Sequence, residues 1–300
     1  MKILKREASN TLLRTEVWTV QPQHISRPLL LTVTVPQRKP GGPIAGTLML
    51  DGNSSAGLLH HATTYLEMGG ELPPSVAVSV GYPLDAPVPF LVARNEDLTP
   101  LPWPEWDRLY GIVLGGLQCP PSGRADAFLA VLVKELKPVL ENEYGIDPRN
   151  WTLVGHSLGG LFATHALLSA PQEFRRYLAV GSSFWWHRPS MFERAEAFGR
   201  EAEPVDVDFY VAAGEFETAE AFKSQWAQFM HLPEWQEYVA CLGGFPDILA
   251  DTRQMADLLG RRPGCRVHAA ELKGDTHSSE VMQAVSLGMR WLHRSPKSAA

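Results

Sequence analysis

Short apolar runs and amphipathic segments follow one another along most of this chain. Residues 11–20 and 29–35 alternate polar and apolar side chains, which predicts half-buried strands. Residues 46–50 and 75–80 are continuous runs of apolar, small and β-branched residues, as is typical of strands buried on both faces. Between these two runs, residues 58–68 have the pattern of a helix. The first part of the chain therefore predicts a sheet with a helix packed against it.

From residue 125 onward, strands and helices alternate in a regular order. Residues 125–144 predict an amphipathic helix, which we expect Pro138 to kink or break. Further strands are predicted at 151–154, 177–180, 207–212 and 266–272, with helices at 161–168, from 218 and at 279–292. This alternation predicts an α/β fold with a mostly parallel central sheet and helices on both faces.

Chain length and local composition predict one domain over residues 1–300. Residues 81–124 are rich in proline and glycine but also carry aromatic side chains, so we interpret them as a long loop that forms one wall of a substrate cleft. Residues 231–262 are the best candidate for an insertion between the last two strands.

Charge and cysteine content exclude several classes of protein. The formal net charge is -6, which gives no reason to expect a nucleic acid or an anionic membrane surface as a partner. No apolar stretch is long enough to span a membrane, and the N-terminal residues lack the apolar core of a secretory signal. Three widely spaced cysteines suit neither a disulfide framework nor a zinc site, so we expect a cytoplasmic protein without a bound metal.

The segment Gly155-His156-Ser157-Leu158-Gly159 lies between a predicted strand and a predicted helix. In this context a serine stands on a sharp turn as an exposed nucleophile, and the small neighbours let strand and helix approach. One alternative is a glycine-rich turn that binds nothing. A phosphate loop is another, but it requires a lysine where this chain has Leu161. The pattern therefore predicts Ser157 as a nucleophile.

A serine hydroxyl needs a base to take its proton. His277 follows the last predicted strand, which fits the order nucleophile, acid, histidine. The acid is expected after the strand at 207–212, where Glu217 is the first choice and Glu215 the runner-up. Asp275 is a weaker candidate because it stands too close to His277 in sequence, and a Ser–His dyad without an acid is a further alternative.

Two backbone N–H groups are expected to stabilise the oxyanion. One belongs to Leu158, directly after the nucleophile. The other is expected in the loop after the strand at 46–50, where Gly52 and Asn53 are the candidates.

Several motifs extend this pattern across nearly the whole chain. They are Leu50-Asp51-Gly52-Asn53, Gly81-Tyr82-Pro83, Arg94, Asp97-Leu98-Thr99-Pro100, Glu135-Leu136-Lys137-Pro138, Ser182-Ser183-Phe184-Trp185-Trp186 and Gly274-Asp275-Thr276-His277. Together with the serine elbow, they resemble the esterase branch of the α/β-hydrolases that includes the enterobactin-type siderophore esterases.

The resemblance implies an α/β-hydrolase that cleaves a small-molecule ester, such as a catechol trilactone. By analogy, Arg94 would contact an anionic or polar group of the substrate, and Trp185 and Trp186 would line an aryl pocket. His156 and Tyr82 are two further candidate substrate contacts.

The residues themselves leave alternatives open. The tryptophan pair is equally consistent with core packing, and Arg94 with an ion pair to Glu96 or Asp97 that holds the long loop. The chemistry predicted from the elbow is ester hydrolysis through an acyl-enzyme, with neither metal nor organic cofactor. Acyl transfer or thioester cleavage at the same site, and a catalytically silent ligand-binding protein, are the alternatives.

Overall fold

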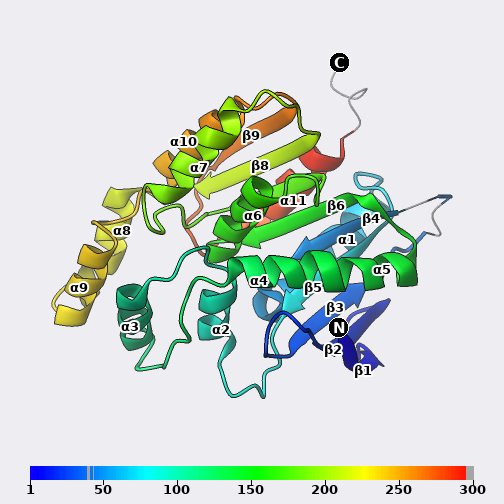
Figure 1. Ribbon diagram of the computed structural model, residues 1–300, viewed down its shortest axis with the longest axis horizontal. Helices are drawn as coiled ribbons and strands as arrows, with labels where there is room; N and C mark the ends of the chain where they lie inside the picture. Colours follow the sequence, from blue (N-terminus) through cyan, green and yellow to red (C-terminus); the bar gives the residue numbers. More distant parts are fainter. Residues whose placement is uncertain (39–40, 43, 295–300) are drawn as a thin grey trace.

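A single mixed sheet forms the centre of the molecule (Figure 1). The computed structural model describes residues 1–38, 41–42 and 44–294. Among these residues, nine strands lie in the order β1-β2-β3-β5-β4-β6-β7-β8-β9. Strands β1, β2 and β3 pair antiparallel with their neighbours, and the remaining pairs, from β5 across to β9, are parallel. The strands are β1 (Lys2–Ala8), β2 (Thr15–Gln21), β3 (Leu29–Thr34), β4 (Ile44–Met49), β5 (Ser75–Gly81), β6 (Ile146–His156), β7 (Arg176–Val180), β8 (Val207–Gly214) and β9 (Cys265–Leu272).

Helices cover both faces of this sheet. Helices α1 and α11 pack together on one face, against β5 and against β7 and β8 respectively, whereas α5, α6 and α10 pack on the other. The helical elements are α1 (Gly52–Met68), α2 (Phe90–Asp97), α3 (Pro104–Val113), α4 (Ala125–Ala130), the π-helix η1 (Val131–Leu136), α5 (Lys137–Tyr144), α6 (Leu158–Ser169), α7 (Ser190–Arg200), α8 (Ala219–Trp226), the 3-10 turn η2 (Ala227–Phe229), α9 (Pro233–Cys241), α10 (Ile248–Leu259) and α11 (Glu280–His293).

Burial explains why the central strands read as apolar runs. Every residue of β4, β5 and β8 is buried, because helices cover both faces of the sheet at these strands. By contrast, every residue of the edge strand β1 is exposed. No pattern of apolar residues predicted this strand from the sequence. The predicted mostly parallel α/β architecture is confirmed.

The segment 81–124 is less irregular than its composition suggested. It contains the helices α2 and α3. Pro89 directly precedes α2, and Pro104 is the first residue of α3. Proline is well tolerated at a helix start because the N–H group that it lacks has no helical partner there. The prolines therefore start helices here, and the expectation of a single long loop was wrong.

The region around Pro138 stays helical but changes its register. The π-helix η1 lies between α4 and α5, and Pro138 is at the start of α5. A π-helical turn interrupts the regular hydrogen-bond ladder. The helix is therefore not broken at Pro138, and its irregularity is the π-helix that ends at Leu136.

The parallel strands bring the predicted chemistry to one edge of the sheet. Asp51 follows β4, Ser157 follows β6, Glu217 follows β8 by three residues, and His277 lies between β9 and α11. Because the carboxyl ends of parallel strands meet at the same edge, these distant residues become neighbours.

In the described part of the chain, no helix has the length and apolar character needed to cross a bilayer. The three cysteines, Cys119, Cys241 and Cys265, are all free thiols.

Candidate active site

Ser157 stands on a strained turn between β6 and α6. Its φ and ψ are 59° and -118°, a backbone conformation that non-glycine residues rarely adopt. A side chain at Gly155 would collide with the carbonyl of Gly159, and one at Gly160 would collide with Ser182. The small residues around the serine are therefore required for strand and helix to approach this closely.

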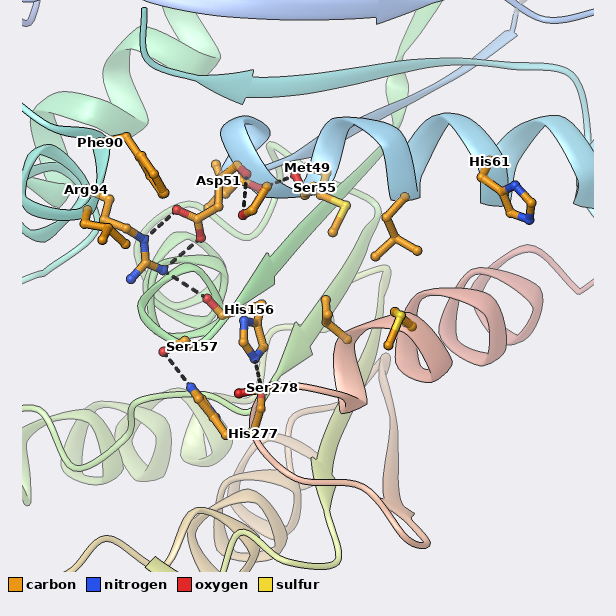
Figure 2. Close-up of a pocket in the computed structure, with 16 residues that line it drawn as sticks. Met49, Asp51, Ser55, His61, Phe90, Arg94, His156, Ser157, His277 and Ser278 are labelled. Atoms are coloured by element: carbon orange, nitrogen blue, oxygen red, sulfur yellow. Dashed lines mark hydrogen bonds and ion pairs between the residues drawn. The ribbon is translucent and has the colours of Figure 1, made fainter. Parts of the chain in front are cut away.

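His277 links the serine to a buried carboxylate (Figure 2 shows the Ser157–His277 contact). Its Nε2 lies 3.1 Å from Oγ of Ser157, and its Nδ1 lies 2.5 Å from Oε1 of Glu217. The Glu217 side chain is fully buried. With Nδ1–H donating to Glu217, Nε2 is left to accept the serine proton, as a general base must.

The structure distinguishes the three candidate acids. Glu217 also accepts a hydrogen bond from the N–H of Gly214 at 2.8 Å. Glu215 lies half-exposed, where it accepts from the N–H of Gly274 at 2.9 Å and contacts Lys273. Asp275 accepts from Oγ of Ser279 at 2.6 Å. Only Glu217 of these three carboxylates contacts His277 within the described structure.

A second buried carboxyl group, which sequence reasoning missed, lies beside Glu217 and His277. The Glu280 side chain is fully buried, and it stands 3.6 Å from Nδ1 of His277. Burial alone would raise the pKa of Glu217, but hydrogen bonds from His277 and Glu280 outweigh burial and lower it. As the first residue of α11, Glu280 reads in sequence like an ordinary exposed helix-start acid.

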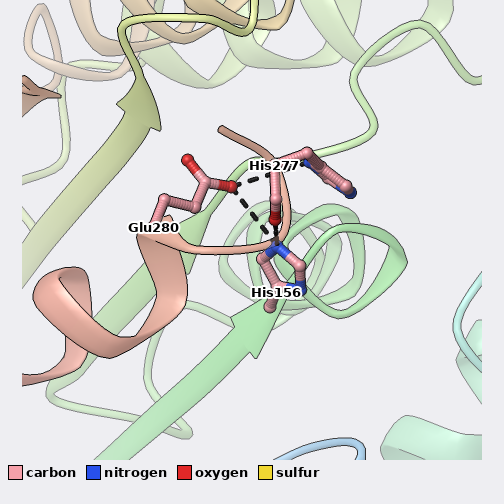
Figure 3. A group of neighbouring side chains, drawn as sticks. All are labelled: His156, His277 and Glu280. Carbon is pink, nitrogen blue, oxygen red and sulfur yellow. Dashed lines mark hydrogen bonds and ion pairs between the residues drawn. The ribbon is translucent and has the colours of Figure 1, made fainter. Parts of the chain in front are cut away.

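His156 contacts the backbone of His277. Its Nε2–H donates to the backbone carbonyl of His277 at 2.9 Å, and Glu280 lies 3.3 Å from the same nitrogen (Figure 3). Burial, with help from His277 and Arg94, holds the pKa of His156 well below its ordinary value. Ligand atoms of His156, His277 and Glu280 lie within 4.8 Å of one another, as in some metal sites. However, Nε2 of His156 already contacts the carbonyl of His277, and Nδ1 of His277 contacts Glu217. A cation would have to displace both of these partners.

Arg94 and Asp51 form a buried ion pair above the serine (Figure 2). Two guanidinium nitrogens donate to the two oxygens of Asp51 at 2.5 Å and 2.8 Å, and Nη2 also reaches the carbonyl of His156 at 3.3 Å. The expected partners Glu96 and Asp97 contact Arg27 instead. Arg94 thus fixes the loop after β4 to the serine elbow.

The candidate oxyanion donors lie at the starts of two helices, α6 and α1. Leu158 is the first residue of α6, directly after Ser157. Gly52 packs against the backbone of Val80 and Gly81, and the Asn53 amide group bonds to the backbone of Tyr82. Neither residue lines a cavity at Ser157, whereas the preceding Asp51 does. The loop after β4 thus reaches the cavity at Ser157 through Asp51, whereas Gly52 and Asn53 contact the end of β5 and Tyr82.

Two cavities meet at Ser157. The larger, about 710 Å³, has a mainly apolar wall that includes Leu58, Phe90 and Met282. A smaller one, about 170 Å³, is lined largely by aromatic side chains. These are Trp106 and Tyr110 of α3, Phe222 and Trp226 of α8, Tyr238 of α9, and Trp185, which lies between β7 and α7. Segments 81–124 and 231–262 therefore both contribute to the wall of the site.

Two predicted substrate contacts belong to the core instead. Tyr82 is buried, and its hydroxyl donates to Asp97 at 3.0 Å. Trp186 is also buried, with its indole N–H donating to the carbonyl of Leu101 at 3.1 Å. Neither lines a cavity at the serine, so the tryptophan pair divides into a core residue, Trp186, and a cavity-lining residue, Trp185.

Comparison with known proteins identifies relatives of the chain. Residues 116–243 match the model of the family described as Putative esterase. The ferri-bacillibactin esterase BesA of Bacillus subtilis is 30% identical over 220 residues, which cover 69% of this chain and 72% of BesA. The siderophore triacetylfusarinine C esterase of Aspergillus fumigatus is 28% identical over 266 residues, which cover 83% of this chain and 81% of that protein.

Solved structures share the fold. The BES protein from Bacillus cereus superimposes with a TM-score of 0.74 at 22% identity, over 96% of this chain and 99% of that chain. The siderophore hydrolase EstB from Aspergillus nidulans gives a TM-score of 0.73 at 19% identity, over 96% and 97% of the two chains. At this level of identity the likeness establishes the fold, and the relationship to BesA establishes the family. This chain is therefore an ester hydrolase with the α/β-hydrolase fold and belongs to the Putative esterase family.

Proposed function

We propose that the chain hydrolyses siderophore esters through an acyl-enzyme formed on Ser157. The observation that carries this proposal is the continuous contact from Ser157 through His277 to the buried Glu217. The names of the relatives, which are esterases of siderophores, support the substrate class and favour hydrolysis over acyl transfer or silent binding.

In the proposed mechanism, Oγ of Ser157 attacks the ester carbonyl while Nε2 of His277 takes the serine proton. The N–H groups of Leu158 and Asp51 stabilise the oxyanion. His277 then returns the proton to the leaving alcohol, and a water molecule activated by His277 releases the acid. Glu217 keeps the imidazole in the required tautomer and stabilises its positive charge.

The two cavities suggest how a siderophore ester would lie. We place an aryl group in the aromatic pocket, where stacking on Trp185 and Trp106 is available. The lactone or peptide part lies in the larger apolar cavity, where Arg94 is already paired with Asp51. This pairing makes Arg94 a hydrogen-bond donor to neutral oxygen atoms rather than a free countercharge.

A hydrolysis panel tests the reaction and the substrate class. Short acyl esters, aryl esters and a catechol trilactone are incubated with the enzyme, and the products are identified by mass spectrometry. We expect linearised trilactone and free acid, with no turnover by Ser157→Ala. Trilactone that stays intact while simple esters are cleaved would contradict the substrate class.

The aromatic pocket is tested separately with Trp185→Ala. Because an aromatic contact contributes about 0.5–1.5 kcal/mol, KM for an aryl ester should rise roughly 3- to 10-fold. KM for a short aliphatic ester should stay unchanged. An equal rise for both esters would contradict the placement of the aryl group.

A further inference from the structure

Glu217 and Glu280 form a carboxyl pair in the interior of the molecule. Both side chains have 0% exposure. The same N–H of Gly214 donates to Oε2 of each, at 2.8 Å for Glu217 and 2.6 Å for Glu280. Two buried carboxyl groups that share one N–H donor do not both ionise. Two negative charges held against the same N–H group would repel strongly in a medium of low dielectric constant.

The contacts of the two groups indicate which of them carries the proton. Glu217 receives the short hydrogen bond from Nδ1 of His277, whereas Glu280 is more than 1 Å farther from that nitrogen, at 3.6 Å against 2.5 Å. Burial, followed by the effect of Glu217, raises the pKa of Glu280 far above its ordinary value. The other titratable groups around Glu280 are His156, which is 3.3 Å away, and Asp275, which raises the pKa further.

The backbone at Gly181 lies close against the two carboxyl groups. Gly181 follows β7 with a φ of 50°, and a side chain there would collide with Oε1 of Glu280. That same oxygen has no hydrogen-bond partner among the described residues. A proton on Glu280 would let this side chain donate a hydrogen bond to Glu217.

We propose that Glu280 is a positioning residue: as a neutral acid it donates a hydrogen bond to Glu217 and holds that carboxylate against His277. The proton stays on Glu280 throughout the reaction, so no step transfers it. This inference rests on the proposed roles of Ser157, His277 and Glu217.

Two substitutions separate hydrogen bonding from packing. Glu280→Gln keeps a neutral donor of the same size, so we expect kcat within about 3-fold of the unaltered enzyme. Glu280→Met removes the donor but fills the space, and we expect kcat to fall roughly 10- to 100-fold with little change in KM. Glu71→Gln is the control. It breaks the ion pair between Glu71 and Arg290 of α11, the helix that begins at Glu280, and should leave kcat unchanged.

The pH dependence of stability provides a readout that does not depend on catalysis. The folded protein keeps a proton on Glu280 that the unfolded chain releases above its ordinary pKa near 4.5. Between pH 5 and 9 the unaltered protein should therefore lose stability with rising pH relative to Glu280→Gln, which has no titrating group at this position. Urea unfolding at several pH values measures this difference.

Opposite results would overturn the proposal. A stability difference that is constant from pH 5 to 9 would show that Glu280 is not protonated by folding. A loss of kcat in Glu280→Gln as large as that in Glu217→Gln would show that Glu280 acts as an ionised acid. If Glu280→Met fails to fold, these two measurements on Glu280→Gln still decide. If the unaltered enzyme cleaves no ester, the proposed function fails, and unfolding alone then tests the pair.

Discussion

At the scale of single residues, the site depends on a division of work between similar groups. Glu217 and Glu215 are separated by one residue, yet one is buried against His277 and the other faces Lys273 near solvent. The end of β8 distinguishes them, because the N–H of its last residue, Gly214, donates to the Glu217 carboxylate. Sequence spacing favoured Glu217, but its burial against His277 is visible only in the folded structure.

The substitution Glu217→Gln tests this division. The amide keeps the shape of the side chain but can present a donor to Nδ1 of His277 and so favour the wrong tautomer. We expect kcat for p-nitrophenyl acetate to fall by about 100-fold or more. The matched variant Glu215→Gln should stay within about 2-fold, since an exposed ion pair contributes little. Equal losses in the two variants would contradict the assignment.

At the scale of elements, the close approach of β6 and α6 should be expensive to disturb. An alanine at Gly155 would press its side chain into the backbone of Gly159, which cannot move aside as a flexible side chain would. We expect Gly155→Ala to destabilise the protein by about 1–3 kcal/mol, as overpacking does. Urea unfolding measures the change.

Gly57 provides the opposite case within a helix of the same fold. It lies inside α1, and a side chain at this position would meet nothing within 4 Å. Gly57→Ala should stabilise the protein by about 0.5–1 kcal/mol, because alanine loses less backbone entropy on folding. A destabilised Gly57→Ala, or an unaffected Gly155→Ala, would contradict this packing.

Strands and helices could be predicted from the sequence where the apolar pattern of their own residues determines which face is buried. The buried strands and the helices α6 and α11 are of this kind, because their apolar patterns match their burial. Prediction failed where position in the fold decides. Pro104 begins α3 inside the segment that was expected to be one long loop, and Gly52 begins α1 where a loop was expected. Glu280 was missed because a helix-start glutamate is normally exposed, whereas in the fold it lies buried against Gly181 and Gly214, at the ends of β7 and β8.

At the scale of the whole molecule, buried polar contacts join the antiparallel part of the sheet to the helical layer. Glu135 of η1 accepts hydrogen bonds from the backbone N–H groups of Gln23 and His24 and from the His24 ring, all at 2.6–3.1 Å. Burial alone would raise the pKa of Glu135, but these hydrogen bonds outweigh burial and lower it to about 2.

Glu135→Gln should therefore weaken the protein in a pH-dependent way. A carboxylate whose pKa is lowered by folding stabilises the native state above its unfolded pKa, and this stabilisation disappears as the pH falls toward the folded pKa. We expect Glu135→Gln to cost about 2 kcal/mol near pH 7, the size of a hydrogen bond to a charged group. The cost should shrink between pH 4.5 and 2. A cost that does not change with pH in urea unfolding would contradict this account.

The central claim is that Ser157 is the nucleophile at the meeting point of the two cavities. A fluorophosphonate probe followed by intact-mass measurement and peptide mapping tests it most directly. We predict one label per chain, on Ser157, absent from Ser157→Ala and retained in Ser183→Ala, whose hydroxyl lies 3.5 Å from that of Ser157. A label on any other serine, or full labelling of Ser157→Ala, would contradict the account.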